Sequence, residues 1–494
     1  MRKIINKIKK FGIIETIVIS VYIIMVLIIA MNHECYEDET QSWLIARDLN
    51  FIEIIQQMKY EGHSFLWYFI IAPFAKLGFP VEVQNYIACG FAIITVYLIL
   101  KKSPFNKGLK ILLIFSPGMI YFYSVIARPY CMIPFFLVCI AILYKDRKKH
   151  PYLYALLIGL LANTHLVMLP TAIMLIITFW GEELLEKRKT QSKEDKVKLI
   201  KSLLVAMIAI IIYIVIILQT LGSCEIVNNF NRIGSMSKIE TVFALIKNTS
   251  MNTISYLYGE NVVPFYYKII VLFVLILCII GTKNNLKQAL IFWSQLIFTI
   301  LIHSFCWFIL ATRVFIVLYT LMFWLWIEKE EQKDKINPKN NKWIEVALVI
   351  LILISSPSVY KLAYQDITGQ FSTGKMMATY IKENIPEGSC FICVNQELQQ
   401  SVVAYLKKDA YQFYMPNLDQ FVTYITWDKE WNRLISQEEI ETSIEKLKKE
   451  YENLYVISIF PIKIEEGTED LFNTENQIID SMYVRREVFY IYQI

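Results

Sequence analysis

Charged residues are scarce in this chain of 494 residues. Asp, Glu, Lys and Arg together make up 19% of it, below the roughly 25% of soluble domains, whereas hydrophobic residues make up 56%. This composition excludes an ordinary cytosolic enzyme. A disordered chain is excluded as well, because such chains are poor in aromatic residues and this one has 30 Tyr, 30 Phe and 10 Trp. The composition indicates a polytopic membrane protein.

Three further features narrow the class of protein. The nine Cys form no dense cluster, which argues against a disulfide scaffold. The net charge is only +5 and is unevenly placed, so it reports membrane topology and no nucleic-acid partner is expected. No glycine-rich phosphate loop is found in the polar C-terminal part.

Apolar runs that approach the length of a membrane span, about 17–25 residues, recur along the chain. The first covers roughly residues 11–31, behind a basic start, and lacks a small-residue cleavage site, which predicts a retained anchor. Ten more lie near residues 84–100, 111–126, 130–144, 152–163, 166–181, 202–221, 264–281, 289–308, 314–327 and 343–360. We therefore expect about eleven transmembrane helices.

The Lys and Arg residues orient these segments. If the spans alternate in direction, the inside loops hold 27 Lys and Arg and the outside segments hold 9. Because cytoplasmic loops are rich in basic residues, we expect a multi-pass cell-membrane protein with a cytoplasmic N-terminus. The apolar run from His63 to Phe79 would reverse this pattern if it crossed the membrane, so it is predicted to be a helix lying on the outer membrane surface.

The chain is predicted to have two domains. Residues 1–360 would form the transmembrane domain, with an outer loop at 32–83, and residues 361–494 a small extracytoplasmic α/β domain. The predicted strands of that domain are Cys390–Val394, Leu454–Phe460 and Val488–Tyr492, and the predicted helices are Lys375–Asn384 and Glu438–Tyr451.

Four cysteines form two possible pairs. Cys390 and Cys393 would point to opposite faces of a strand, which favours buried core thiols over a redox or metal site. Cys35 and Cys224 both fall outside the membrane and could pair, but their spacing does not decide this.

The outer loop opens with an acidic cluster, Glu37, Asp38 and Glu39. Packed carboxylates repel one another, which raises the pKa of at least one and suits it to act as a general base. The same residue types are common at helix starts, so the charge pattern alone leaves both interpretations open.

Four cationic or titratable residues interrupt apolar stretches at the outer face: His63, Arg128, His165 and Arg313. Each has an ordinary explanation, because arginine can snorkel to the interface and a lone histidine is often part of a core. Arginine also pairs with phosphate through two parallel hydrogen bonds. Since the topology places all four in one layer with the carboxylates, and ionisable residues near membrane depth tend to be functional, we expect a phosphate-displacing transferase.

At this point the chain resembles the GT-C superfamily of membrane glycosyltransferases, most closely the branch of protein O-mannosyltransferases and the bacterial lipid A aminoarabinose transferase. The resemblance rests on an ordered set of features over roughly residues 1–330. These are the pair Asp38-Glu39 after the first span, the helix bearing Trp43, Ala46 and Arg47, the segment EGHSFLWYFIIAPFAKLGF, the segment SPGMIYFYSVIARPY, and Arg313 before a late span.

The resemblance implies a GT-C fold whose first outer loop contains two helices lying flat on the membrane. It implies a polyprenyl-phosphate-linked sugar donor and an extracytoplasmic glycan, lipid or protein acceptor. Asp38 would deprotonate the acceptor hydroxyl and Glu39 would orient it. Arg128, His165 or Arg313 would stabilise the leaving phosphate, and His63 is a further substrate-binding candidate.

The chain departs from the family pattern at two places. Tyr130, a substrate-binding candidate, stands where the family has a second acidic residue, and Ser64-Phe65 replaces a Pro-Pro pair. These departures leave open which sugar and acceptor are used and whether a divalent metal takes part.

Two other classes of function compete with a transferase. A lipid-linked sugar flippase would contain discontinuous helices near mid-membrane. These are not evident in the sequence, although Gly and Pro interruptions exist at Pro117-Gly118 and Pro134. A non-catalytic membrane scaffold would use its outer domain to bind a partner.

Overall fold

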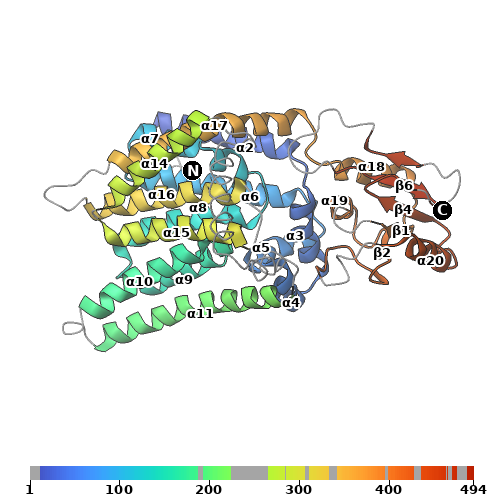
Figure 1. Cartoon of the computed structure of the whole chain (residues 1–494), viewed down its shortest axis with the longest axis horizontal. Coiled ribbons are helices and arrows are strands. Elements are labelled where there is room, and N and C mark those ends of the chain that lie inside the picture. The colour runs from blue at the N-terminus through green and yellow to red at the C-terminus, as the bar shows by residue number, and fades with distance from the viewer. Residues whose placement is uncertain are drawn as a thin grey trace, which may run out of the picture.

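The structure, a computed structural model, describes most of the chain. The described residues are 12–186, 193–223, 265–283, 285–305, 311–332, 342–394, 399–427, 435–462, 464, 470–475 and 487–494. They form a helical bundle followed by a smaller domain that contains a sheet (Figure 1).

A helix lies at each of the eleven apolar runs. The helices of the bundle are α2 (Ile13–Asn32), α6 (Val83–Lys102), α7 (Lys107–Ile114), α8 (Met132–Leu143), α9 (Pro151–Ala162), α10 (Leu169–Glu186), α11 (Lys193–Ser223), α14 (Phe265–Thr282), α15 (Leu286–Phe305), α16 (Ala311–Gln332) and α17 (Lys342–Thr368). Among the described residues, seven helical stretches are long and apolar enough to cross a membrane. The chain is thus a mostly helical, multi-pass membrane protein.

The predicted span at 111–126 is not one continuous α-helix. Helix α7 ends at Ile114, and a π-helical turn, η1 (Gly118–Phe122), follows Pro117. Proline lacks a backbone N–H and clashes with the preceding turn, which explains why the α-helix does not continue. The added Cβ of any side chain at Gly118 would come within 2.5 Å of the Tyr319 hydroxyl, so the close packing of η1 requires this glycine.

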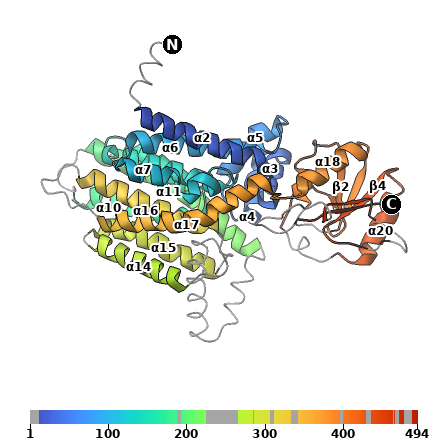
Figure 2. The same ribbon diagram turned by 90° about the horizontal axis from the view of Figure 1, so that it is seen from above.

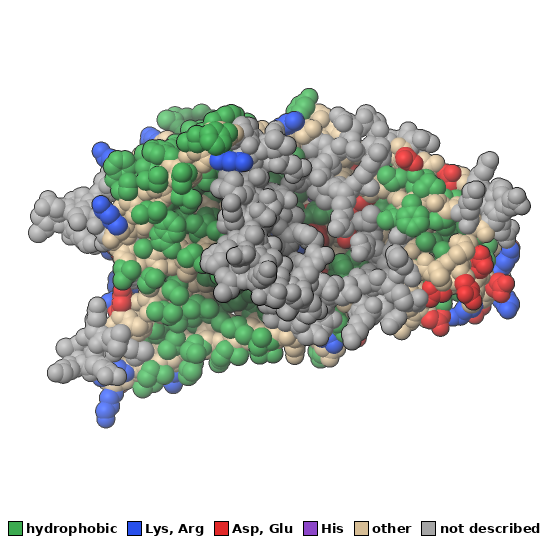
Figure 3. Space-filling view, viewed as in Figure 1, with side chains coloured by type: hydrophobic (Ala, Val, Ile, Leu, Met, Phe, Trp, Pro, Cys, Tyr) green, Lys and Arg blue, Asp and Glu red, His purple; other side chains and the backbone are tan. Residues whose placement is uncertain are grey.

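The outer surface of the bundle is apolar, as a lipid-facing surface should be. Large side chains such as Ile24, Leu272 and Leu353 are more than half exposed. Figure 3 shows hydrophobic side chains over the bundle, with Lys and Arg at its end away from the smaller domain. The C-terminal end of α10 and the N-terminal end of α11 lie at that end too (Figure 1). Residues 187–192 of the predicted inside loop 182–201 lie outside the described residues, and sidedness stays a prediction.

The outer loop contains three helices where the resemblance implied two. They are α3 (Glu37–Asp48), α4 (Phe51–Glu61) and α5 (Leu66–Lys76), and they lie between the bundle and the smaller domain (Figure 1). Helix α4 is capped by Asn50, which accepts hydrogen bonds from the N–H groups of Ile52 and Glu53, and it ends at Gly62 in the left-handed conformation (φ 66°) that favours glycine. The surface helix therefore begins at Leu66 rather than at His63, because Gly62 ends the preceding helix first.

The smaller domain is α/β. Its strands are β1 (Cys390–Cys393), β2 (Gln412–Met415), β3 (Gln420–Phe421), β4 (Leu454–Ser458), β5 (Phe472–Asn473) and β6 (Tyr490–Gln493), in the order β3-β2-β1-β4-β6-β5. The central strand β1 is parallel to β2 and β4, and the other pairs are antiparallel. The helices are α18 (Gly374–Asn384), α19 (Gln400–Val403) and α20 (Gln437–Leu447).

The three predicted strands and two predicted helices of this domain lie where the sequence placed them. Cys390 and Cys393 are buried free thiols that belong to two different apolar clusters, one on each face of the sheet. Helix α17 runs through the expected boundary at residue 360 and ends at Thr368, so the bundle is joined to the α/β domain by a helix (Figure 2).

Candidate active site

Asp38 and Glu39 are neighbours at the start of α3 and have opposite environments. The Asp38 side chain is 43% exposed, whereas the Glu39 side chain is fully buried. Successive residues of a helix point about 100° apart, so one carboxylate faces open space while the other faces the bundle.

Hydrogen bonds saturate the Glu39 carboxylate. Its Oε1 accepts from Asn85 Nδ2 at 2.9 Å and from the Ala127 N–H at 2.5 Å, and its Oε2 lies 2.9 Å from His33 Nε2. A carboxylate held in this way fixes the first turn of α3 and has little room to accept a substrate proton. The geometry therefore fits an orienting role for Glu39.

His33 lies between two buried carboxylates. Its Nδ1 is 2.7 Å from Asp366 Oδ2, and Tyr121 donates to the same oxygen at 2.8 Å. Burial lowers the pKa of His33, but Asp366 and Glu39 outweigh it and raise the pKa to about 10. The imidazolium thus links the end of α2 to α3 and to α17.

Arg128 contacts the exposed carboxylate. Its Nη1 donates to the Asp38 backbone carbonyl at 2.7 Å and lies 3.3 Å from Asp38 Oδ1. Burial lowers the pKa of Arg128, but Asp38 and nearby tyrosines raise it above its ordinary value. The buried Nε has no hydrogen-bond partner in the described part of the chain.

The second Nη of Arg128 lies 3.2 Å from His63 Nε2. A guanidinium cannot accept a hydrogen bond, so His63 must accept here and its proton must reside on Nδ1. Burial, followed by the charges of Arg128 and Arg313, lowers the pKa of His63 to about 3. His63 is therefore a neutral imidazole at physiological pH.

The remaining predicted residues continue this network. The His63 and His165 rings are 5.2 Å apart, and His165 Nε2 is 3.4 Å from the Tyr130 hydroxyl, which accepts from Arg313 Nε at 2.9 Å. Because His165 Nδ1 accepts the Val167 N–H, Nε2 of the neutral ring carries the proton and donates to Tyr130. All seven predicted site residues thus lie in one neighbourhood.

Glu61 is a fourth carboxyl group near this network, and the sequence analysis missed it. It accepts from Gln41 Nε2 at 2.9 Å and from the Tyr68 hydroxyl at 3.4 Å. Burial raises the pKa of Glu61 to about 7, and its hydrogen bonds lower it only in part. The sequence offered one sign of this residue, since Glu61 lies two residues before the candidate His63.

Two ligand questions remain from the sequence analysis. Among the described residues, no group of three His, Cys, Asp or Glu side chains is placed to hold a metal. The sequence left open whether a divalent metal takes part. Cys35 is a buried free thiol that donates to Asn85 Oδ1 at 3.0 Å, and its suggested partner Cys224 lies outside the described residues.

Comparison with known proteins gives a structural likeness. No family model and no curated protein matches the chain. Its fold is similar to the crystal structure of ArnT from Cupriavidus metallidurans bound to undecaprenyl phosphate, with 9% sequence identity, 97% of both chains covered and a TM-score of 0.49. At this level of similarity the chemistry has to be argued from the side chains described above.

Proposed function

We propose that this chain is an integral membrane glycosyltransferase. It would transfer a sugar from a polyprenyl-phosphate-linked donor to an extracytoplasmic glycan, lipid or protein acceptor, by an inverting displacement. The observation that carries the proposal is the pairing of the half-exposed Asp38 carboxylate with the buried cation Arg128, 3.3 Å apart, at the head of a buried network that ends at Arg313.

Asp38 acts as the general base. Its carboxylate takes the proton of the acceptor hydroxyl while the hydroxyl oxygen attacks the anomeric carbon. The bond from that carbon to the phosphate oxygen breaks on the opposite face, which inverts the anomeric centre. The electron pair of this bond leaves with the polyprenyl phosphate, so the products are a glycosylated acceptor, a protonated Asp38 and a lipid phosphate anion.

The two arginines stabilise the leaving phosphate. Negative charge grows on the phosphate as the bond breaks, and at a membrane surface uncompensated charge is costly. Arg128 has an unpartnered buried Nε, and Arg313 is held by Tyr130. Neutral His63 accepts from Arg128 without competing with it for the anion.

The Asp38→Asn variant tests the base. It keeps the size of the side chain and removes its basicity, so transfer from a polyprenyl-phosphate sugar to cell-envelope extract should fall about 10² or more. The neighbouring Glu37→Gln variant is the control and should transfer normally. Glu39→Gln should lower the melting temperature more than it lowers turnover, because its bonds to Asn85 and Ala127 hold the helix start.

Other outcomes identify the competing functions. Normal turnover of both Asp38→Asn and Glu39→Gln would mean that the acidic cluster has no catalytic role and only forms the start of a helix. A flippase would move the lipid-linked sugar across proteoliposomes without any transfer to an acceptor. A scaffold would do neither, while its outer domain retained a partner.

A further inference from the structure

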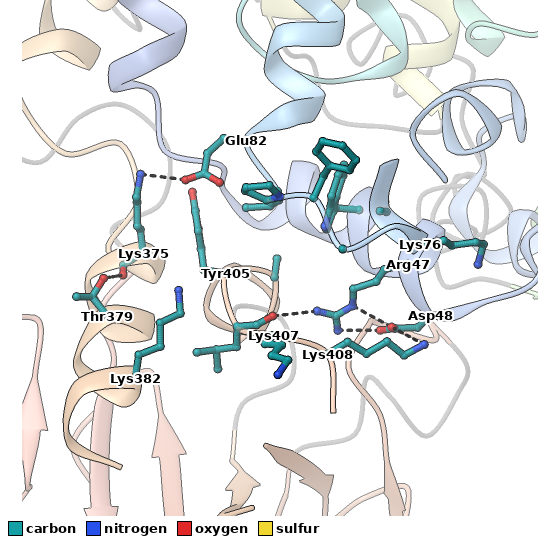
Figure 4. A pocket seen from close by; sticks show the side chains of 18 of the residues that line it. Arg47, Asp48, Lys76, Glu82, Lys375, Thr379, Lys382, Tyr405, Lys407 and Lys408 are labelled. Atoms are coloured by element: carbon teal, nitrogen blue, oxygen red, sulfur yellow. Dashed lines mark hydrogen bonds and ion pairs between the residues drawn. The ribbon is translucent and has the colours of Figure 1, made fainter. Parts of the chain in front are cut away.

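A cavity of about 1020 Å³ lies beside the candidate active site and is separate from it. Its walls are the C-terminal end of α3, the α5–α6 connection, α18 and the residues that follow α19 (Figure 4). None of the seven predicted site residues lines it. The cavity therefore lies between the outer-loop helices and the α/β domain, and a ligand in it would not contact the candidate active site.

The lining of the cavity carries more basic than acidic residues. Six of its lining residues are basic and three are acidic: Arg47, Lys76, Lys375, Lys382, Lys407 and Lys408 against Asp48, Glu53 and Glu82. Two of the acids are already paired, because Glu82 lies 3.0 Å from Lys375, and Asp48 lies 2.9 Å from Arg47 and 3.6 Å from Lys408.

Three basic residues are outside these ion pairs. Lys76 Nζ donates to the Leu49 backbone carbonyl, which leaves Lys382 and Lys407. Both are exposed, and neither has an ion-pair partner within the described part of the chain. Lys382 extends from α18 into the cavity (Figure 4). This part of the lining therefore offers positive charge to an anionic group.

Part of the cavity lining is apolar. It includes Phe51 at the start of α4 and Phe79 and Pro80 after α5, and Phe51 and Phe79 are each 48% exposed. The residues beside them, Ile52 and Leu77, are 69% and 76% exposed. Large apolar side chains exposed at the ends of helices are typical of helices that lie in the membrane interface, so we infer that this part of the lining faces the lipids.

We propose that this cavity binds an anionic diacyl phospholipid of the surrounding bilayer. The phosphate of the headgroup would lie against Lys382 and Lys407, and the acyl chains would run along Phe51 and Phe79 into the membrane. A lining that carries both basic and apolar side chains matches such an amphiphile, because basic clusters at the membrane surface attract anionic lipids. The proposal does not depend on the transferase activity, since no residue of the candidate active site takes part.

The bound lipid would join the α/β domain to the membrane. Protein contacts across the same junction already exist, since Arg47 Nη1 donates to the Leu406 carbonyl at 3.3 Å and the Tyr405 hydroxyl accepts the Cys35 N–H at 2.6 Å. A phospholipid in the cavity would add a bridge from α18 to the α5–α6 connection, beside the Lys375–Glu82 ion pair.

The test is a lipid titration of the full-length protein in detergent, followed by native mass spectrometry. Phosphatidylglycerol, phosphatidylcholine and polyprenyl phosphate are compared for wild type, for K382E/K407E and for the control K448E/K449E. The control reverses two equally exposed lysines beyond α20, away from the cavity lining. All four substituted residues are on the surface, and equal melting temperatures would show that the variants are folded.

We expect wild type and the control to bind phosphatidylglycerol at least about 10-fold more tightly than phosphatidylcholine, and K382E/K407E to lose this preference. Equal affinity of wild type for the two phospholipids would overturn the proposal. An unchanged preference in K382E/K407E would overturn it too, because the lipid would then bind elsewhere. Displacement of phosphatidylglycerol by equimolar polyprenyl phosphate would also overturn it, since the cavity would then be a second site for the donor lipid.

Discussion

The imidazole Nδ1 of His33 lies 2.7 Å from the Oδ2 atom of Asp366, across 333 positions of sequence. Asp366 is two residues from the end of α17, just before the chain enters the α/β domain. Through its other nitrogen, His33 holds Glu39 at the start of α3. The helix that carries Asp38 is thus fixed to both the first and the last helix of the bundle.

The first prediction concerns the stability that this contact provides. The pKa of His33 is raised to about 10 in the folded protein, above its unfolded value of about 6.5. Stability from this group is therefore complete below about pH 6.5 and is lost as the pH rises towards 10. Asp366→Asn should lower the melting temperature at pH 6.5, because breaking a buried pair costs about 3–5 kcal/mol. Between pH 6.5 and pH 10, the melting temperature of the variant should fall less than that of wild type.

Melting curves of the purified protein between pH 6 and 10 measure this difference. The matched control is Glu345→Gln, on the same helix as Asp366. It removes a partly exposed ion pair with Lys329 of α16 and should cost about 1 kcal/mol or less. Parallel pH dependence of wild type and Asp366→Asn would contradict a charged His33.

The second prediction concerns the neutral state of His63. Its Nε2 accepts from Arg128, and its pKa is lowered to about 3, so activity above pH 5 should show no ionisation of this residue. His63→Gln supplies an amide oxygen as acceptor and should keep kcat within a few-fold. His63→Leu leaves the guanidinium without that acceptor and should cost about tenfold, in line with an unsatisfied buried donor.

The pH profile of kcat/KM distinguishes this role from acid–base catalysis. If His63 transferred protons, His63→Gln would be as inactive as His63→Leu and would remove one limb of the profile. Equal activity of the two variants would mean that the contact with Arg128 has no effect on turnover.

The sequence indicated which residues of the candidate site lie together, but it did not indicate the contacts that position them. Asp38, Arg128 and Arg313 stand out because each is a charge at the edge of an apolar run, and topology alone puts them in one layer. The pairing of His33 with Asp366 could not be predicted, because nothing local links residues on the first and last helices of a bundle. Glu61 was missed since an acid at a helix end is ordinary until its burial is known.

The fold shows the same division. Long apolar runs and alternating strands are local signals, so the helices of the bundle and the strands β1, β4 and β6 could be predicted. The break after α7 depends on Pro117 and on how Gly118 packs against Tyr319, and β3 and β5 are only two residues long. Such features depend on tertiary contacts and not on a sequence period.

The third prediction is topological. The α10–α11 junction should be cytoplasmic and Asn473 extracytoplasmic, because inside loops carry 27 Lys and Arg against 9 outside. Single Cys residues at Lys193 and Asn473, in a chain freed of its nine native Cys, should react with an impermeant maleimide only after permeabilisation for the first and in intact cells for the second. Labelling of both from the same side would remove the eleven-span arrangement and the shared outer layer of site residues.

The last prediction concerns the leaving group. Arg128 and Arg313 lie at the two ends of the network through His63, His165 and Tyr130, so a phosphate between them would meet charge from both sides. Arg128→Ala and Arg313→Ala should lower kcat as well as donor affinity, because the charge they meet grows in the transition state. Arg128→Lys should rescue only in part, since it restores the charge without the planar fork.

Steady-state kinetics with a polyprenyl-phosphate sugar separate these effects. A rise in KM with unchanged kcat would show that the arginines bind the donor equally in the ground state and the transition state. A divalent metal could share the task, and in that case EDTA would abolish turnover and added metal would restore it. If both Ala variants turned over normally and EDTA had no effect, the phosphate would have to be stabilised by His165, Tyr130 or backbone N–H groups, and the assignment of the two arginines would be wrong.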